Sequence, residues 1–184
     1  MKEIKVALIG FGGIARSHNA AYHELALYGL PITMVAVCDK YVEKFSTQTA
    51  INIGSDTTPL PKDVHLYTDI DALIAAEDFD MADVCLPSFL HSEVTIKLLN
   101  AGKHVLCEKP MALSSEESQA MLDAMEKNGK QLMIGQCLRF DAQYLYLKEC
   151  IRSEIYVKLE SIDMNRHSVY PKWCADKWHE DKTK

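Results

Sequence analysis

The sequence predicts an α/β fold in which helices cover both faces of a doubly wound parallel sheet, followed by the start of an incomplete second α/β domain. Short runs of apolar residues alternate along the chain with longer segments of helical periodicity. Within each run the residues are apolar at consecutive positions, which is typical of parallel strands buried on both faces. No internal repeat or low-complexity tract interrupts this alternation.

Six of the apolar runs have the length of buried strands. The first ends directly at Gly10, and the second is followed at once by Asp39. The fourth is broken by Pro87, which cannot donate a ladder hydrogen bond. The predicted strands are Ile4–Ile9, Ile32–Cys38, His65–Tyr67, Ala82–Leu86, His104–Cys107 and Leu132–Ile134.

Helical segments separate these strands and carry end signals. Gly102 is a suitable C-terminal cap, and Ser114 or Ser115 is a suitable N-cap because Glu117 follows. Residues 52–63, with one glycine and two prolines, are predicted as a loop of above-average length. The predicted helices are Ile14–Leu27, Val42–Ala50, Asp69–Ala76, His91–Asn100, a segment from Ser115 to about Asn128, and Asp141–Ile151.

After the last helix the pattern changes to alternation of apolar and polar residues. Ile155, Val157 and Leu159 share one phase, which then shifts at Ile162 and Met164. We expect one long strand with a β-bulge at the shift. A lone strand has unpaired backbone on both edges, so its partners must come from other chains or from strands that were removed.

Composition and charge exclude several classes of partner. Hydrophobic residues make up 48% and charged residues 25%, an ordinary balance for a globular domain. The net charge is −6 with scattered lysines and arginines, so the chain offers no footprint for nucleic acid or for an anionic membrane. No apolar run approaches the roughly 18 residues of a membrane span. The N-terminus runs straight into a strand without a signal peptide, so a cytoplasmic location is expected.

The six cysteines lack any C-x-x-C spacing, and three of them lie at or near the ends of apolar runs. This is typical of buried free thiols in a reducing compartment, and no metal site is expected. The cysteines are Cys38, Cys85, Cys107, Cys137, Cys150 and Cys174.

The turn after the first strand has the pattern Gly10-x-Gly12-x-x-Ala15. Gly10 permits the tight turn, Gly12 lets the backbone approach a pyrophosphate, and Ala15 allows close helix–strand packing. The helix that starts near Gly13 directs its N–H groups at the phosphates. A strand before the turn and a helix after it are the context of a dinucleotide site; the alternative is a tight turn without a ligand. The predicted cofactor-binding residues here are Gly10, Phe11, Gly12, Gly13, Ile14 and Ala15.

Asp39 follows the glycine turn at about the distance expected for an acid that binds the cofactor ribose. Its carboxylate can accept from both ribose hydroxyls and would repel a 2′-phosphate, which favours NAD over NADP. Lys40 can soften that repulsion, so NADP stays an alternative. Asp39 can also be the N-cap of the next segment, and the two roles are compatible.

Three residues after the fourth strand are predicted near the cofactor ribose: Pro87, Ser88 and His91. Ser88 can hydrogen-bond the ribose or the N-terminus of its own helix. The alternative for His91 is a structural role, which is the commoner one for a single histidine that opens a helix.

Lys109 is the candidate catalytic residue. Its backbone is fixed between a buried strand and Pro110, and partial burial would lower the pKa of its amine toward a range useful for proton transfer. The alternative is an ordinary solvated surface lysine. Glu108 can orient that amine or hold a substrate hydroxyl, and both residues are also predicted to bind the cofactor.

Four of these features come directly after strands: the Gly12 loop, Asp39, Pro87-Ser88 and Glu108-Lys109. They should therefore line the carboxyl edge of one sheet, where open α/β sheets bind ligands. A dinucleotide and a reacting amine are expected to meet at that edge.

The pattern resembles the Gfo/Idh/MocA oxidoreductases, relatives of glucose–fructose oxidoreductase and inositol dehydrogenase. The resemblance covers nearly the whole chain. It rests on the glycine turn, Asp39, Pro87, His91, Gly135, Arg139-Phe140 and above all Ala101–Pro110.

This resemblance implies an NAD(P)-binding Rossmann domain over residues 1–136. Residues 137–184 would hold a connecting helix and the first strand of a truncated C-terminal domain for substrate binding and oligomerisation. A homo-oligomer is therefore expected for the complete protein. The resemblance also implies that Lys109 contacts substrate and nicotinamide, and that a cis bond precedes Pro110.

Two departures from the family pattern stand out. Ser88 replaces an asparagine that many relatives place beside the ribose. The glycine-rich stretch and the Asp-x-x-x-His pair of the family's second domain are missing. Asp176-x-x-His179 has the wrong spacing and no preceding glycines, so we interpret it as coincidence.

The activity implied by the resemblance is hydride transfer between nicotinamide and a carbinol carbon of a sugar, inositol or related polyol. We expect the 184-residue chain to bind cofactor and to turn over slowly or not at all. One alternative is a non-enzymatic nucleotide-sensing module on the same fold. Another is a methyltransferase-like protein that uses S-adenosylmethionine, against which Glu108-Lys109-Pro110 argues.

Overall fold

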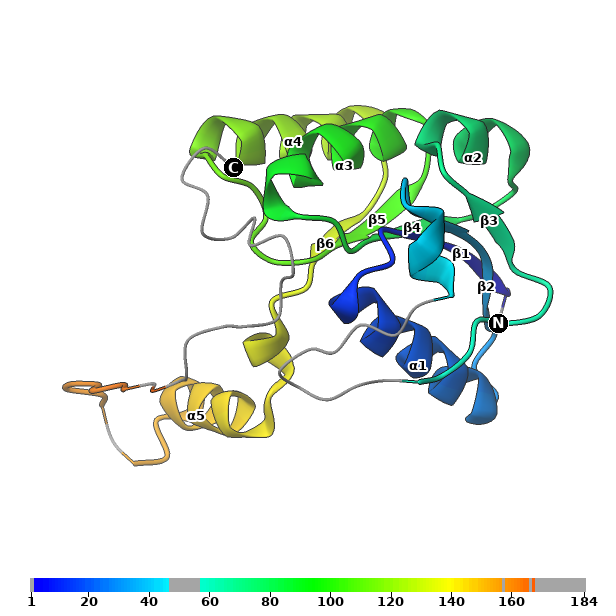
Figure 1. The fold of residues 1–184 in the computed structure, drawn as a ribbon. Helices are drawn as coiled ribbons and strands as arrows, with labels where there is room; N and C mark the ends of the chain where they lie inside the picture. Colours follow the sequence, from blue (N-terminus) through cyan, green and yellow to red (C-terminus); the bar gives the residue numbers. More distant parts are fainter. Residues whose placement is uncertain (1, 47–56, 157, 166, 168–184) are drawn as a thin grey trace. The chain divides into compact units, whose positions relative to one another are not determined.

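Six parallel strands form one sheet in the order β3-β2-β1-β4-β5-β6, which confirms the predicted doubly wound fold (Figure 1). The computed structural model describes residues 2–46, 57–156, 158–165 and 167. The strands are β1 (Ile4–Ile9), β2 (Ile32–Cys38), β3 (His65–Tyr67), β4 (Met81–Val84), β5 (His104–Cys107) and β6 (Leu132–Ile134). Only β4 departs from its predicted bounds, because the chain turns out of the sheet toward Pro87 after Cys85.

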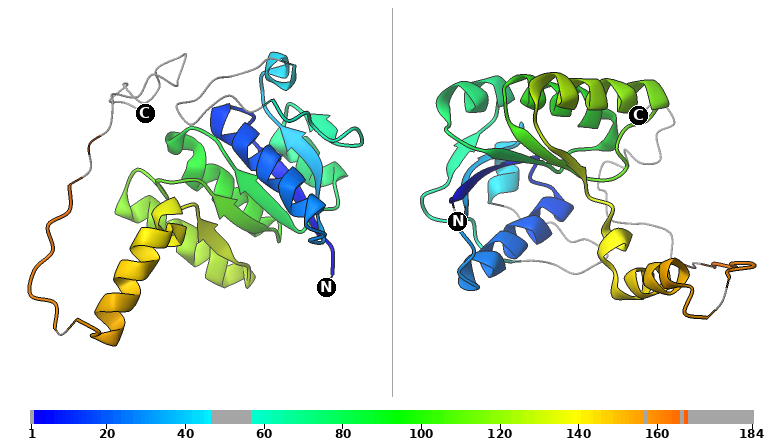
Figure 2. Two further views of the ribbon diagram at one scale, coloured as in Figure 1. Left: turned by 90° about the horizontal axis from the view of Figure 1, so that it is seen from below. Right: turned by 180° about the vertical axis from the view of Figure 1, so that it is seen from behind.

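Helices cover both faces of this sheet: α2, α3 and α4 lie on one face and α1 lies on the other (Figures 1 and 2). Three short 3₁₀ helices, η1 to η3, occur in the connections. The helices are α1 (Gly13–Leu27), η1 (Val42–Phe45), α2 (Ile70–Ala76), η2 (Ser88–Leu90), α3 (His91–Asn100), α4 (Ser115–Asn128), η3 (Cys137–Phe140) and α5 (Ala142–Ser153).

The predicted helix-end signals are present. Ser114 Oγ accepts a hydrogen bond of 3.1 Å from the Glu117 N–H, and the Glu117 carboxylate accepts one of 2.9 Å from the N–H of Leu113. Gly102 follows the end of α3 with a φ of 78°, a conformation that glycine adopts without strain.

The alternation of side chains along buried strands divides the core into two layers. In β1, Ala7 and Ile9 join a cluster with Leu98 and Met121 on the side of α3 and α4. Leu8 points to the other side and packs in a cluster with residues of the glycine turn and α1. Both faces of the strand are thus buried, which explains its continuous apolar run.

The cysteines near strand ends belong to this core. Cys38, Cys85 and Cys107 are buried free thiols, as predicted. Cys137 is exposed and Cys150 is half-buried, and Cys174 lies outside the described residues.

Two predicted elements differ from the structure. The helix expected over 42–50 is the single 3₁₀ turn Val42–Phe45, and residues 47–50 lie outside the described part. The strand expected after Ser153 does not form among the described residues 154–156, 158–165 and 167. A strand needs a hydrogen-bonding neighbour, and this segment has no partner strand in the described chain.

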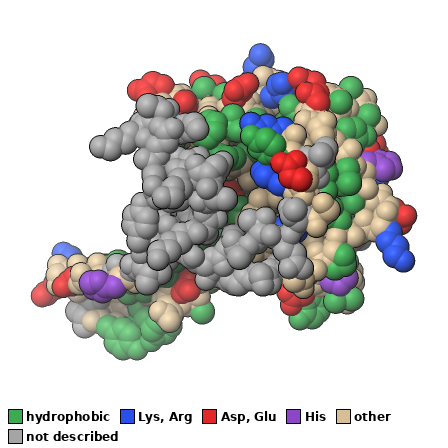
Figure 3. Space-filling view, viewed as in Figure 1, with side chains coloured by type: hydrophobic (Ala, Val, Ile, Leu, Met, Phe, Trp, Pro, Cys, Tyr) green, Lys and Arg blue, Asp and Glu red, His purple; other side chains and the backbone are tan. Residues whose placement is uncertain are grey.

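The chain divides into two compact units, one ending at Gly135 and the other beginning at Gln136. The second unit contains η3 and α5, whose N-cap Asp141 accepts from the Gln143 N–H at 2.9 Å. No residue of α5 is buried, and apolar side chains gather on the surface of this unit (Figure 3). Among the described helices, none combines the length and apolar character needed to cross a membrane.

Candidate functional site

At the carboxyl edge of the sheet, the residue that follows each of four strands is hydrogen-bonded to the neighbouring strand. Each donates its backbone N–H to a carbonyl at or near the end of a neighbouring strand. The bonds are Gly10 to Cys38 (2.7 Å), Cys85 to Ile9 (2.7 Å), Glu108 to Val84 (2.9 Å) and Gly135 to Cys107 (2.7 Å). The glycine turn and the segment before Pro110 therefore lie on the same edge, separated by the loop after β4.

The two glycines of the turn are required for different reasons. Gly10 has a φ of 88°, and a Cβ there would lie 2.8 Å from the carbonyl oxygen of Cys85, so only glycine fits. A Cβ on Gly12 would meet nothing within 4 Å. No side chain caps α1 at its N-cap Gly12. Open space in front of uncapped N–H groups at the start of a long helix suits an anionic group such as a pyrophosphate.

Side chains of the turn anchor it to the protein. Phe11 is 1% exposed; its ring centroid lies 6.2 Å from that of Phe45 and 4.6 Å from the guanidinium carbon of Arg16. Ala15 is fully buried, as the close helix–strand packing requires, whereas Ile14 is half-buried. Phe11 can therefore contribute to a ligand site only through its backbone.

Both carboxylate oxygens of Asp39 already accept hydrogen bonds from the protein, in addition to the predicted role of binding the cofactor ribose. Its Oδ2 accepts from the Phe11 N–H at 2.8 Å and from Lys44 Nζ at 3.0 Å, and its Oδ1 accepts from the Tyr41 N–H at 2.9 Å. Tyr41, and not Asp39, is the N-cap of η1. The cation that pairs with this carboxylate is Lys44, whereas Lys40 lies over the ring of Tyr41.

The residues after β4 form a buried support. The His91 imidazole is 1% exposed, with Nδ1 2.7 Å from the carbonyl oxygen of Pro110 and Nε2 2.8 Å from that of Leu86. It ties the loop after β4 to the segment after β5, so its nitrogens are committed to backbone. Ser88 begins η2 and is also buried, and Pro87 before it is half-buried.

Lys109 is exposed, one residue beyond the end of the sheet's hydrogen-bonded edge. The partial burial expected for its amine is not found, because the residue lies past the strand end, where no described element of the first unit covers it. The peptide bond between Lys109 and Pro110 is cis, as the family resemblance implies.

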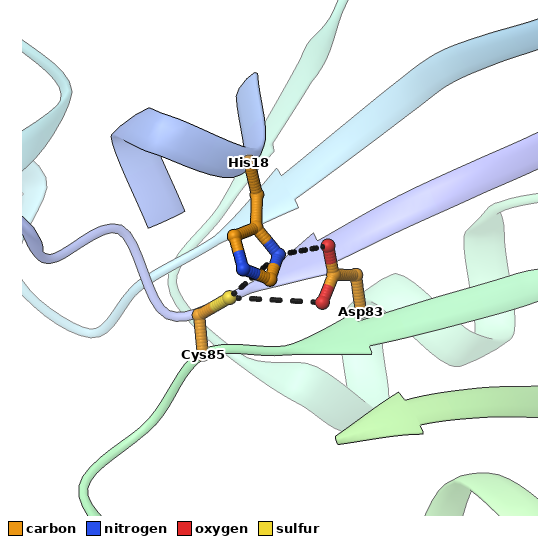
Figure 4. Close-up of side chains that lie close together, drawn as sticks. All are labelled: His18, Asp83 and Cys85. Atoms are coloured by element: carbon orange, nitrogen blue, oxygen red, sulfur yellow. Dashed lines mark hydrogen bonds and ion pairs between the residues drawn. The ribbon is translucent and has the colours of Figure 1, made fainter. Parts of the chain in front are cut away.

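A buried polar cluster that the sequence reading missed lies under this edge (Figure 4). Asp83 in β4 is fully buried, and its Oδ2 accepts from His18 Nδ1 at 2.7 Å and from the Tyr22 hydroxyl at 2.8 Å. The Cys85 thiol lies 3.6 Å from Asp83 Oδ1, and His18 Nε2 lies 3.2 Å from Glu108 Oε1. The sequence contained a signal: Asp83 is the one charged residue in an apolar strand, and a buried carboxylate needs partners.

Charges in this cluster stabilise one another. Burial lowers the pKa of His18, but hydrogen bonds to Asp83, Cys85 and Glu108 outweigh it and raise that pKa well above its usual range. Burial raises the pKa of Glu108, but His18 outweighs this effect and holds it below its usual value. Burial and the charge of Asp83 raise the pKa of Tyr22, and they raise that of Cys85 to about 12. The His18 imidazole lies between two carboxylates, an arrangement that favours its protonated form.

His18, Asp83 and Cys85 also form a set of nitrogen, oxygen and sulfur atoms that all lie within 4.8 Å of one another. Such a set can hold a divalent metal ion. The distances of 2.7 and 2.8 Å to Asp83 Oδ2 are those of shared protons. A metal would require His18 to release the proton it donates to Asp83, so the described geometry fits an ion network better.

Comparisons with known proteins agree with the fold. The family model for Gfo/Idh/MocA, an oxidoreductase family with an NAD-binding Rossmann fold, matches residues 4–136. The D-glucoside 3-dehydrogenase of Escherichia coli (strain K12) is 32% identical over 158 residues, covering 84% of this chain and 42% of that protein. The inositol 2-dehydrogenase of Salmonella typhimurium is 31% identical over 154 residues, covering 82% of this chain and 42% of that protein.

Solved structures give the same result. The WlbA dehydrogenase of Chromobacterium violaceum, determined with NADH and UDP-GlcNAcA, has a TM-score of 0.70 at 27% identity, covering 84% of this chain and 41% of that chain. The chain spans less than half the length of these relatives.

Proposed function

The chain belongs to the Gfo/Idh/MocA family of oxidoreductases with an NAD-binding Rossmann fold, and from this premise we propose that it binds NAD(H) for hydride transfer to or from a sugar, inositol or related polyol. The observation that carries the proposal is the shared edge of the sheet. Gly12, with open space beside it, follows strand β1, and the exposed residue Lys109 follows strand β5. Only strand β4 lies between β1 and β5 in the sheet.

The glycine turn would hold the pyrophosphate. The uncapped N-terminus of α1 presents N–H groups and the positive end of a helix dipole, and Gly12 leaves room for the phosphate oxygens. Asp39 would accept hydrogen bonds from the adenosine ribose through carboxylate lone pairs that Phe11, Tyr41 and Lys44 do not occupy. Its charge favours NAD, although Lys44 offsets part of that charge.

Lys109 would handle the proton of the reaction. NAD⁺, when bound, supplies the acceptor for the hydride of the carbinol carbon. The amine of Lys109 would accept the hydroxyl proton as the carbinol is oxidised to a carbonyl group. Glu108 would fix the backbone that carries this amine, because Glu108 Oε2 accepts from the Lys109 N–H at 3.1 Å.

Calorimetric titration of the 184-residue chain with NAD⁺, NADP⁺ and S-adenosylmethionine tests the cofactor. We expect micromolar binding of NAD⁺, weaker binding of NADP⁺ and none of S-adenosylmethionine. Binding of S-adenosylmethionine without NAD⁺ would contradict the proposal. NADH formation over a panel of polyols should be slow or absent for this chain, and turnover that persists undiminished in Lys109→Met would contradict the role of the amine.

A nucleotide-sensing module on the same fold is the second candidate. The exposure of Lys109 favours it, since partial burial was the expected means of fitting the amine for proton transfer. Such a module would bind NAD⁺ and NADH with different affinities and would transfer no hydride with any polyol of the panel.

A further inference from the structure

His18 joins the helix of the glycine turn to the strand end that carries Lys109. The histidine lies in the second turn of α1, and its two ring nitrogens face carboxylates from two different strand ends. Nδ1 lies 2.7 Å from Asp83 Oδ2, and Nε2 lies 3.2 Å from Glu108 Oε1. An imidazole can satisfy two carboxylates only when both nitrogens carry protons.

Glu108 is held at both of its oxygens. Oε1 faces His18, while Oε2 accepts from the backbone N–H of Lys109 at 3.1 Å. Gly135, after β6, closes the remaining side, because a Cβ there would lie 2.9 Å from Glu108 Oε1. The carboxylate is confined between α1, the Lys109 backbone and the end of β6.

Among the described residues, two carboxylates face His18 and favour its cation, while the Cys85 thiol faces it as an uncharged group. Asp83 comes from β4, Cys85 from the loop after β4 and Glu108 from the end of β5. Tyr22, one turn further along α1, donates to Asp83. Loss of the His18 charge would leave two carboxylates, 0% and 14% exposed, without a cation between them.

We propose that His18 is a positioning residue of the hydride-transfer site, which as a doubly hydrogen-bonded cation fixes Glu108 and through it the backbone that carries Lys109. This proposal rests on the proposed function. It adds a chain of hydrogen bonds, called the link below, that runs from α1, which would hold the cofactor phosphates, through His18 and Glu108 to the backbone of Lys109, which would move the proton. Asp83, Tyr22 and Cys85 anchor the far side of the link.

Nuclear magnetic resonance on the 184-residue chain tests the link. In the wild-type chain, both ring nitrogens of His18 should carry protons from pH 6 to pH 9. In His18→Gln and in Glu108→Gln the amide resonance of Lys109 should shift by several line widths. The double variant should shift it no further than either single variant, because both substitutions break the same chain of contacts. His23→Gln is the matched control, since His23 is exposed on the same helix, and it should leave the resonance in place.

The outcomes separate the link from the proposed function. A Lys109 resonance that stays in place in folded Glu108→Gln, or a neutral His18 at pH 7, overturns the positioning role. So does stoichiometric binding of Zn²⁺ that removes the ring protons, which would assign the cluster to a metal. Wild-type chain that shows the link but does not bind NAD⁺ refutes the proposed function instead. Glu108→Gln keeps the test open if His18→Gln fails to fold, because Glu108 lies nearer the surface than Asp83.

Discussion

Oδ2 of Asp39 accepts a hydrogen bond of 2.8 Å from the backbone N–H of Phe11, so the acid at the end of β2 is bound to the glycine turn at the end of β1. The two features that the sequence separates by a whole helix thus act as one unit. The position of the glycine turn, and so of any ligand bound to it, therefore depends on the carboxylate of Asp39.

Replacement of this acid should affect both stability and cofactor choice. Asp39→Asn has a single carbonyl oxygen for the N–H groups of Phe11 and Tyr41, which both bond to the carboxylate. We expect a loss of about 1–2 kcal/mol in the free energy of unfolding. Lys44 also loses its partner, so the ratio of NADP⁺ to NAD⁺ affinity should rise about tenfold, equivalent to ~1.4 kcal/mol. Urea unfolding and calorimetric titration measure the two effects. Asp63→Asn, at an exposed position, should change neither.

The two glycines of the turn should respond to alanine in opposite ways. Gly10→Ala places a Cβ 2.8 Å from a backbone oxygen at a φ of 88°, and it should cost about 3 kcal/mol or more of unfolding free energy. Gly12→Ala meets no neighbour within 4 Å, and should cost about 1 kcal/mol or less while it weakens NAD⁺ binding at least tenfold. Chemical unfolding and NAD⁺ titration of both variants provide the measurement. Equal destabilisation by the two substitutions would show that Gly12 is a packing residue and not part of a ligand site.

The strands and the loops that carry the candidate site residues were predictable because their signals are local. β1, β2, β3, β5 and β6 have their predicted bounds, since each is a short run that is followed directly by a glycine or a polar residue. The His18–Glu108 contact was not predictable in this way, because it joins residues 90 positions apart. Asp83 gave a hint that a partner existed without saying which. The strand predicted after Ser153 was wrong for a different reason. Alternation of apolar and polar residues shows that an extended segment would have one apolar face, but a strand also needs a neighbouring strand for its backbone hydrogen bonds.

The His18 cluster should make stability depend on pH. The folded-state pKa of His18 is raised above the value of about 6.5 for an unperturbed histidine. Its stabilisation is fully present below about pH 6.5, where the unfolded chain also holds the proton. It declines as pH rises above that value, because only the folded state keeps the proton, with a slope of about 1.4 kcal/mol per pH unit at most. Glu108, with a lowered pKa, contributes stability that is lost only at acidic pH.

The unfolding free energy of wild-type chain should therefore exceed that of His18→Gln by more at pH 6 than at pH 8.5. Urea unfolding at both pH values gives the comparison, and His23→Gln serves as the control for loss of an exposed histidine. An equal difference at the two pH values would mean that His18 is not charged in the folded chain.

The side chain of Glu108 should be the reason that position 135 requires a glycine. A Cβ at this position would lie 2.9 Å from Glu108 Oε1 and 3.3 Å from its carboxyl carbon, so Gly135→Ala must displace the carboxylate from His18. We expect a loss of about 1–2 kcal/mol in the free energy of unfolding, from the broken ion contact. Glu108→Ala removes the obstructing atoms and the ion contact together. Adding Gly135→Ala to that variant should therefore cost less than about 0.5 kcal/mol, a non-additivity that a double-mutant cycle in urea reports directly. Additive losses would place the constraint in the backbone of β6 and not in the Glu108 side chain.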